Sequence, residues 1–294
     1  MMSGNAVVPE REISIVLDTY PHTRAIKEGQ IASPGIKLNF IEYNPINKAF
    51  NPMVEEQKFD VCEMAVGTFF QALDSGKPLK LLPAVMGGEF HHGSLWYEPK
   101  NGALTPGDLK GKRVGVRAYT QTTGIWVRGV LQEQYGVPCD DVTWVTSEAP
   151  HVEGYVNPPN VELSKGADLT QMLRDGELSA VIIGPKQGNG AGFTHLIPNV
   201  DAASAAWYEK HKTVPINHMV VVTEKLIKND AAAVLAITDL FRQGIESVRA
   251  ASAASPQAIR FGKENVWDAL ELAIRYSFEQ KLISRVFKKE EVFA

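Results

Sequence analysis

Short apolar runs alternate with mixed polar and apolar stretches along most of the chain. In the first third, the apolar runs are short enough for strands, and they lie at 13–17, 36–41, 59–62 and 79–85. Between them, mixed stretches predict helices over 23–29, 47–56 and 67–73. This alternation is typical of βα units, which build largely parallel α/β sheets with helices on their faces.

The same alternation restarts in the middle third and continues towards the C-terminus. A polar loop is expected over 151–166. The glycine-rich run at 187–192 is expected to be a mobile loop, and it lacks the lysine spacing of a phosphate-binding loop. Predicted strands lie at 95–97, 112–116, 142–145, 179–183 and 214–223, and predicted helices at 168–174, 234–248 and 266–278.

Two turn-rich breaks divide the chain into a discontinuous first lobe and an inserted second lobe. The breaks lie at about 97–106 and 210–216. They place the first lobe at 10–96 plus 216–294 and the second lobe at 97–215. Two α/β lobes joined by two crossings form a hinged cleft. Because strand ends and helix starts lie at one edge of such sheets, we expect ligands to bind there.

The segment at 112–129 is a candidate anion-binding site. The first turn of a helix offers free backbone N–H groups and the positive end of the helix dipole, which bind carboxylate or phosphate. Here a predicted strand runs into a polar turn that opens a helix, with Arg117 and Arg128 on either side. The alternative is an ordinary helix start, because threonine at an N-cap needs no ligand. The side chains of the turn are Tyr119, Thr120, Gln121, Thr122 and Thr123.

Three further side chains follow predicted strands and are therefore candidates for the cleft. Glu63 ends one strand, and Thr68 lies near the start of the helix that follows it. Lys186 follows the strand at 179–183 from the other lobe. A carboxyl group in such a cleft often has a shifted pKa, so Glu63 is a candidate proton donor. The alternative role for Glu63 is to cap the next helix.

Composition and charge narrow the choice of partners and of compartment. Hydrophobic residues make up 44% of the chain and charged residues 22%, as in ordinary globular proteins. The net charge is −4, without a basic block, which argues against nucleic acid, and no apolar run is long enough to span a membrane. The chain starts without a secretory pattern, and Cys62 and Cys139 lack metal-type spacing. We therefore expect a cytoplasmic protein with reduced cysteines.

Four motifs resemble the 4,5-dihydroxyphthalate decarboxylase family. They are FDVCEM at 59–64, DLKGKRVGV at 108–116, IWVRGVL at 125–131 and PINHM at 215–219. The resemblance covers about 13–225, and the first and third motifs are the more specific ones. That family is similar to a type 2 periplasmic-binding-protein fold that has become a cytoplasmic enzyme. The resemblance therefore implies a two-lobed fold of this type and a decarboxylase activity.

The resemblance also implies roles for one arginine and several histidines. Arg24 matches the family's arginine after the first strand, and it is expected to clamp a carboxylate. His92 and His218 match family positions and are expected in the site. His22 and His91 stand where the family has an acidic residue and an arginine, so the exact acid stays open. We expect no metal, because neighbours such as His91 and His92 on an extended segment face opposite sides.

The first functional hypothesis is a cofactor-independent decarboxylase of a hydroxylated aromatic acid, of the benzoate or phthalate kind. Arg24, Arg117 and the helix start would hold the acid, and closure of the lobes would exclude water. His92, His218 or a Glu63 of raised pKa would deliver a proton to carbon as carbon dioxide leaves. A ring hydroxyl in the ortho or para position would let the ring accept that proton as a keto tautomer.

Two other hypotheses fit the same fold. One is an organic-anion solute-binding protein of an ABC-type transport system, because a fold does not fix a function. The other is a related lyase on the same scaffold. In each case the expected partner is a small carboxylate. The C-terminal helices carry apolar faces that a homodimer would cover, and the sequence leaves the oligomeric state open.

Overall fold

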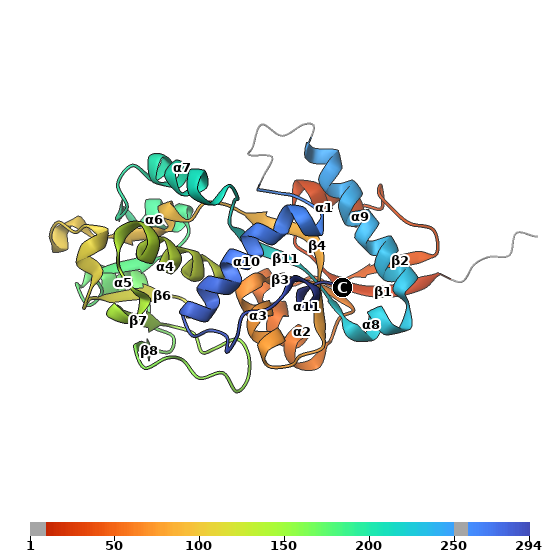
Figure 1. Ribbon diagram of the computed structural model, residues 1–294, viewed down its shortest axis with the longest axis horizontal. Helices are drawn as coiled ribbons and strands as arrows, with labels where there is room; N and C mark the ends of the chain where they lie inside the picture. Colours follow the sequence, from red (N-terminus) through yellow and green to blue (C-terminus); the bar gives the residue numbers. More distant parts are fainter. Residues whose placement is uncertain (1–9, 250–257) are drawn as a thin grey trace, which may run out of the picture.

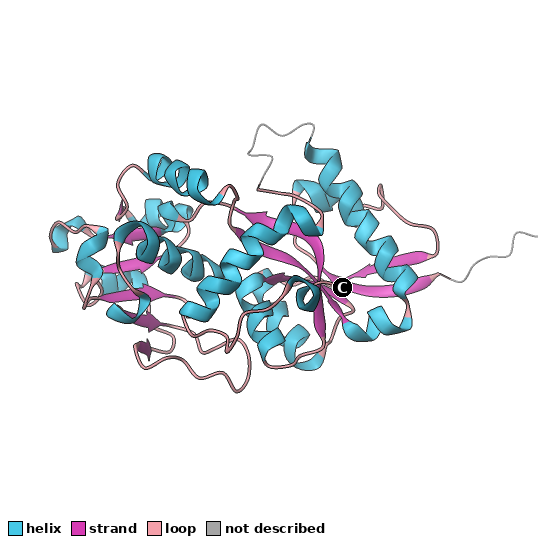
Figure 2. Cartoon of the chain, in the orientation of Figure 1, coloured by secondary structure: helices cyan, strands magenta, loops and turns pink. Residues whose placement is uncertain are grey.

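Two lobes lie side by side in the computed structural model, which describes residues 10–249 and 258–294 (Figure 1). Each lobe is built on its own β-sheet with helices packed around it (Figure 2). In Figure 1 the first lobe lies on the right and the second on the left, with helix α10 (Lys263–Glu279) in the middle of the molecule.

The sheet of the first lobe has five strands in the order β2-β1-β3-β11-β4. The pairs of β1 with β2 and of β1 with β3 are parallel, whereas β11 runs antiparallel to both β3 and β4. The sheet is therefore mixed, and its fourth member comes from far along the chain. The strands are β1 (Arg11–Val16), β2 (Ile36–Phe40), β3 (Val61–Ala65), β4 (Leu79–Gly88) and β11 (Ile216–Thr223).

The sheet of the second lobe has six strands in the order β10-β5-β9-β6-β7-β8. The four strands from β9 to β8 are parallel, and β5 and β10 form an antiparallel edge. The strands are β5 (Leu95–Tyr97), β6 (Arg113–Val116), β7 (Thr143–Thr146), β8 (Val161–Leu163), β9 (Ala180–Ile182) and β10 (Thr194–His195).

Helices cover the sheets of both lobes. In the described parts of the chain, no helix combines the length and the apolar character that a membrane span requires. Besides α10, the α-helices of the two lobes are α1 (Pro21–Lys27), α2 (Phe50–Glu56), α3 (Val66–Asp74), α4 (Thr122–Tyr135), α5 (Leu169–Arg174), α6 (Pro185–Ala191), α7 (Val200–His211), α8 (Glu224–Asn229), α9 (Ala231–Arg249) and α11 (Lys289–Val292).

Both faces of the first sheet are buried, because its side chains alternate between two apolar clusters. Along β3, Val61 packs with helix α9, whereas Cys62 and Met64 pack with the cluster that contains α2 and α3. Each such apolar side chain stabilises the fold by roughly 1.5–3 kcal/mol on burial. Gly244 in α9 allows α9 to approach α1 closely, since a Cβ there would lie 2.3 Å from the His22 carbonyl oxygen.

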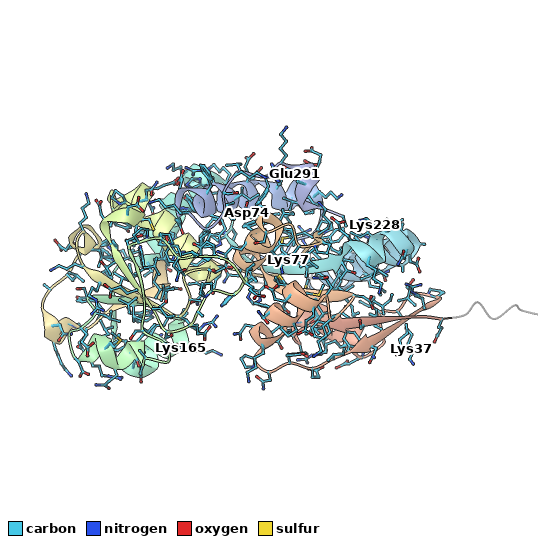
Figure 3. All side chains as sticks on the ribbon, turned by 90° about the horizontal axis from the view of Figure 1, so that it is seen from below. Lys37, Asp74, Lys77, Lys165, Lys228 and Glu291 are labelled. Carbon is cyan, nitrogen blue, oxygen red and sulfur yellow. The ribbon has the colours of Figure 1, made fainter. Side chains whose placement is uncertain are left out.

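The C-terminal segment ties the two lobes together. Arg128 of α4 is 1% exposed, and it donates hydrogen bonds to Gln280 Oε1 at 2.6 Å and to the Tyr119 carbonyl at 2.7 Å. A few residues later, Ser284 donates to Asp74 of α3 from its N–H at 2.9 Å and from its hydroxyl at 2.8 Å. Figure 3 labels Asp74 beside this segment. The chain after α10 therefore contacts α4 of the second lobe and the C-terminal end of α3 in the first lobe.

The predicted strands and helices are confirmed, with boundaries shifted by a few residues. The short elements β8, β10, α8 and α11 were not predicted, and β8 lies within the loop that was expected over 151–166. The glycine-rich run was expected to be a loop, which is wrong: it forms helix α6, where Pro185 pre-sets the first turn and Gly188 packs against the Trp96 ring. Helix α7 was not expected, since only Ser204 and Trp207 of its side chains are buried and the apolar pattern is weak.

The first passage between the two sheets lies earlier than the predicted break at 97–106. Strand β4 ends at Gly88 in the first sheet, and β5 begins at Leu95 in the second. The chain returns to the first sheet after α7, between His211 and Ile216. The sequence before residue 10, in which no secretory pattern was found, lies outside the described residues.

Candidate functional site

A cavity of about 170 Å³ lies between the lobes and takes its lining from both. Part of its wall is apolar, and the rest carries hydrogen-bonding or charged side chains. From the first lobe come Ile46, Asn47, Phe50, Ala65, Asn217 and His218, and from the second come Arg117, Gln121, Thr122, Thr123 and His151.

His218 reaches the cavity from the middle of β11, and a buried carboxylate lies behind it. Its Nδ1 donates to Glu63 Oε1 at 2.7 Å, while the Phe50 ring packs edge-on against the imidazole at 5.5 Å between centroids. The pairing register of β11 with β4 shifts on either side of His218. Such irregularities often re-aim a side chain next to an active site. The bond to Glu63 fixes the ring orientation and leaves Nε2 as the second ring nitrogen.

Glu63 is fully buried and is held by three donors. The Tyr20 hydroxyl donates to Oε1 at 2.7 Å, and the Asp18 N–H donates to Oε2 at 3.1 Å. Burial alone raises the pKa of a carboxyl group, but the hydrogen bond and charge of His218, with the other two donors, bring the pKa of Glu63 below its ordinary value. The predicted raised pKa of Glu63 is therefore wrong in direction. Glu63 is therefore an ionised carboxylate that accepts the hydrogen bond of His218.

The start of α4 forms one part of the cavity wall. Gln121 is the N-cap, and Thr122 and Thr123 begin the helix, whose first N–H groups have no acceptor within it. The start of α3 meets this helix start directly, because the Gly67 N–H donates to Thr122 Oγ1 at 3.1 Å. A Cβ at Gly67 would lie 2.5 Å from the Thr120 carbonyl oxygen. Two helix N-termini thus meet at the cavity, and both favour negative charge there.

A second polar cluster closes the cavity from the loop after β7. Arg117 donates to Glu148 Oε2 at 2.7 Å, and His151 Nε2 lies 3.8 Å from the same carboxylate oxygen. His151 Nδ1 lies 3.0 Å from Thr68 Oγ1, so the second lobe contacts α3 of the first. Thr68 itself is buried and supports His151, rather than forming part of the cavity lining.

The other predicted histidines are buried and lie outside the cavity lining. His91 Nε2 lies 2.7 Å from Oδ1 of the cavity residue Asn217, and burial lowers the pKa of His91 to about 4. His92 Nε2 lies 2.8 Å from Gln134 Oε1 of α4, and burial lowers the pKa of His92 as well. His22 stacks on Tyr20, and burial lowers its pKa to about 4. All three are neutral near pH 7, and none lines the cavity.

These buried histidines predict a loss of stability in acid. Unfolding raises the pKa of His91 from about 4 to its ordinary value near 6.5, so the unfolded chain binds more protons throughout that interval. The contribution of His91 to stability therefore falls with pH below 6.5, by roughly 3 kcal/mol at pH 4 relative to pH 7. Urea unfolding of His91→Gln should show a shallower decline from pH 7 to pH 5 than the wild type, and equal slopes would contradict this assignment.

Several predicted site residues lie away from the cavity or have other partners. Arg24 is exposed on α1, and Lys186 is exposed on α6. The Tyr119 hydroxyl is buried and donates to the Gln280 carbonyl at 2.9 Å. The buried Thr120 hydroxyl donates to Gln71 Oε1 at 2.7 Å, and Arg128 serves the same contact between the lobes. The structure brings together Glu63, His218, Arg117, Thr68 and 121–123, and it does not bring Arg24 or Lys186 to them.

Sequence reasoning missed several residues of the site. Tyr20 gives no chemical signal beyond its position near the end of β1, and Glu148 and Asn217 read as ordinary polar residues. His151 begins the polar loop predicted over 151–166, and no motif surrounds it. A signal for Asn217 was present, because it precedes His218 in the PINHM motif.

The fold defines the class of protein to which this architecture is similar. A periplasmic sulfonate-binding protein of an ABC transporter from Methylobacillus flagellatus matches with a TM-score of 0.61 at 12% identity, over 98% of this chain and 92% of that one. The periplasmic aliphatic sulphonate binding protein of Escherichia coli matches with a TM-score of 0.61 at 14% identity, over 96% and 92%. The desulfurization enzyme DszB matches with a TM-score of 0.56 at 14% identity, over 96% of each chain. The predicted two-lobed binding-protein fold is therefore confirmed.

The sequence relatives belong to fewer classes of protein than the solved structures that share the fold. A family model described as NMT1/THI5 like matches residues 19–157. A 4,5-dihydroxyphthalate decarboxylase from Comamonas testosteroni is 28% identical over 235 residues, which cover 73% of this chain and 69% of that protein. One from Pseudomonas putida is 28% identical over 222 residues, which cover 69% and 83%. The predicted resemblance to 4,5-dihydroxyphthalate decarboxylases is confirmed.

Proposed function

We propose that this protein is a carboxy-lyase that removes carbon dioxide from a hydroxylated aromatic acid bound in the cavity between the lobes. The observation that carries the proposal is the contact of 2.7 Å between the buried Glu63 carboxylate and His218 at the cavity wall. A binding protein needs donors for its anion, but it does not need a histidine held by a buried carboxylate. The names of the two sequence relatives point to the same reaction.

The size and lining of the cavity suit one substituted aromatic ring. A cavity of roughly 150 Å³ holds a benzene molecule in an apolar protein core, and this one measures about 170 Å³. Ile46, Phe50 and Ala65 supply an apolar wall for a ring face. The polar part of the wall, formed by the α4 start and Arg117, suits a carboxylate because N–H groups and a guanidinium both donate hydrogen bonds to it.

His218 is the proton donor in this account. Decarboxylation replaces the carboxylate on a ring carbon with hydrogen, so one proton must arrive at that carbon. In the imidazolium form, His218 donates this proton from Nε2. Before the transfer, Glu63 stabilises the positive charge of the imidazolium. The bond from the ring carbon to the carboxylate then breaks and carbon dioxide leaves. The electron pair of the broken bond restores the aromatic ring. Residues of both lobes line the cavity, so closure of the lobes around the bound acid would exclude water.

A solute-binding protein for an organic anion is the second candidate function, favoured by the kind of protein with which the fold is shared. The experiment that separates the two is a carbon dioxide release assay over 4,5-dihydroxyphthalate, para-hydroxybenzoate and their non-hydroxylated parents, with metal and chelator controls. Each compound is also tested for a thermal shift. Release from a hydroxylated acid, unaffected by chelator, supports the decarboxylase. A thermal shift without release contradicts it and favours the binding protein.

A further inference from the structure

His151 belongs to the second lobe but is positioned by the first. It lines the cavity from the loop after β7, and its Nδ1 lies 3.0 Å from the fully buried hydroxyl of Thr68 on α3. Two residues further on, the Glu153 N–H donates to Glu55 Oε1 of α2 at 2.9 Å. The imidazole is therefore held in one place only when the two lobes meet, as they do here.

The two imidazoles of the cavity lie in unequal electrostatic surroundings. His218 contacts the fully buried carboxylate of Glu63 directly, at 2.7 Å. For His151, the nearest carboxylate oxygen belongs to Glu148 at 3.8 Å, on a side chain that is 44% exposed and already bonded to Arg117. A charge in direct contact with a buried opposite charge is stabilised more than one beside a solvated, shared partner. His218 thus has a buried carboxylate in direct contact, whereas His151 has a buried hydroxyl and a solvated, shared carboxylate as its neighbours.

We propose that His151 accepts the proton of a ring hydroxyl, an assignment that rests on the proposed decarboxylase function. The substrate class is then aromatic acids whose hydroxyl stands ortho or para to the departing carboxylate. Only in those positions does removal of the hydroxyl proton push electron density onto the carbon that must be protonated. Pairs of titratable groups whose environments differ in this way commonly divide the acid and base roles of a reaction.

His151 Nε2 takes the hydroxyl proton, and the oxygen's electrons move into the ring to form a ketone. The carbon that bears the carboxylate takes the proton of His218. The carbon–carbon bond then breaks, carbon dioxide leaves, and the electron pair restores the ring as a phenolate. His151 returns its proton to that oxygen, and His218 regains one from solvent, so the net reaction consumes one proton.

The test compares substrates whose hydroxyl groups differ in acidity. With the hydroxylated acid that the wild type decarboxylates fastest in the panel above, His151→Gln should lower kcat by about 100-fold, as expected for loss of a general base. A ring-fluorinated analogue has a more acidic hydroxyl, so it needs the base less. We expect it to recover about tenfold of the loss in His151→Gln, and raising the pH should have the same effect.

Two variants and a control keep the test decisive. Thr68→Val keeps the His151 side chain but removes the hydroxyl that positions it. This variant should therefore show a smaller loss of kcat than His151→Gln, with the same sensitivity to fluorination. It provides the test even where His151→Gln folds poorly. His218→Gln should gain nothing from fluorination, since its defect lies at carbon. An equal loss on both substrates in His151→Gln, or no loss at all, overturns the assignment. Absence of release by the wild type itself would instead overturn the proposed function.

Discussion

Replacement of His218 by glutamine is expected to remove nearly all turnover while leaving binding almost unchanged. Glutamine keeps a polar side chain near Glu63 but carries no transferable proton. Loss of a general acid lowers kcat by about 100- to 10,000-fold. The dissociation constant for a non-reacting aromatic acid should change by less than about tenfold, since the α4 start and Arg117 remain. Steady-state kinetics and calorimetric titration measure the two effects separately.

The matched control is the variant His195→Gln. His195 is a half-buried histidine on β10 that stacks on Trp96 away from the cavity. This variant should keep wild-type turnover. Glu63→Gln should fall between the two in kcat, because His218 remains but loses its charged partner. Turnover by His218→Gln within a few fold of the wild type would remove His218 from the reaction.

Substitution of Gly67 by alanine is expected to separate the lobes and disable the site without touching a reacting group. The added Cβ would lie 2.5 Å from the Thr120 carbonyl oxygen and 2.7 Å from Ile125 Cδ1, so the starts of α3 and α4 must move apart. That movement breaks the bond from Gly67 to Thr122 and shifts the anion donors relative to His218. A misplacement of about 1 Å costs roughly 100-fold in rate. We expect kcat/KM to fall by about that factor, with a lower Tm.

Gly190→Ala provides the comparison for Gly67→Ala. Gly190 also lies in a helix, α6, but no other atom lies near the position of an added Cβ. Alanine there should raise Tm slightly, because it favours the helix, and should leave kcat/KM unchanged. If Gly67→Ala behaves like Gly190→Ala in both measurements, the close contact between the two helix starts has no role in the site.

The fold was largely predictable because alternating apolar periodicity is a local signal. The run around Val61 shows its strand character in the sequence, and the helix at 234–248 shows its apolar stripe. Helix α6 was not predictable, since glycines lower helix propensity and the packing of Gly188 against Trp96 involves a residue far away in the sequence. Helix α7 was missed because a helix with few buried side chains carries little apolar pattern.

The site was only partly predictable, because its geometry depends on contacts between segments far apart in sequence. Strand ends and the α4 start identified Glu63, Arg117 and Thr122 from local pattern. Nothing local indicates that His151 meets Thr68, 83 positions away. The sign of the pKa shift at Glu63 also depends on partners, since burial and the bond to His218 act in opposite directions.

The central claim is that this cavity decarboxylates a hydroxylated aromatic acid with His218 as the donor to carbon. Its most direct test is turnover of the carboxyl-labelled acid in deuterium oxide, by the wild type and by His218→Gln, followed by mass spectrometry. The account predicts one labelled carbon dioxide for each product molecule, and one deuterium on the vacated ring carbon, from the wild type and almost none from the variant. Labelled carbon dioxide from both proteins at similar rates would contradict it, as would binding without any release.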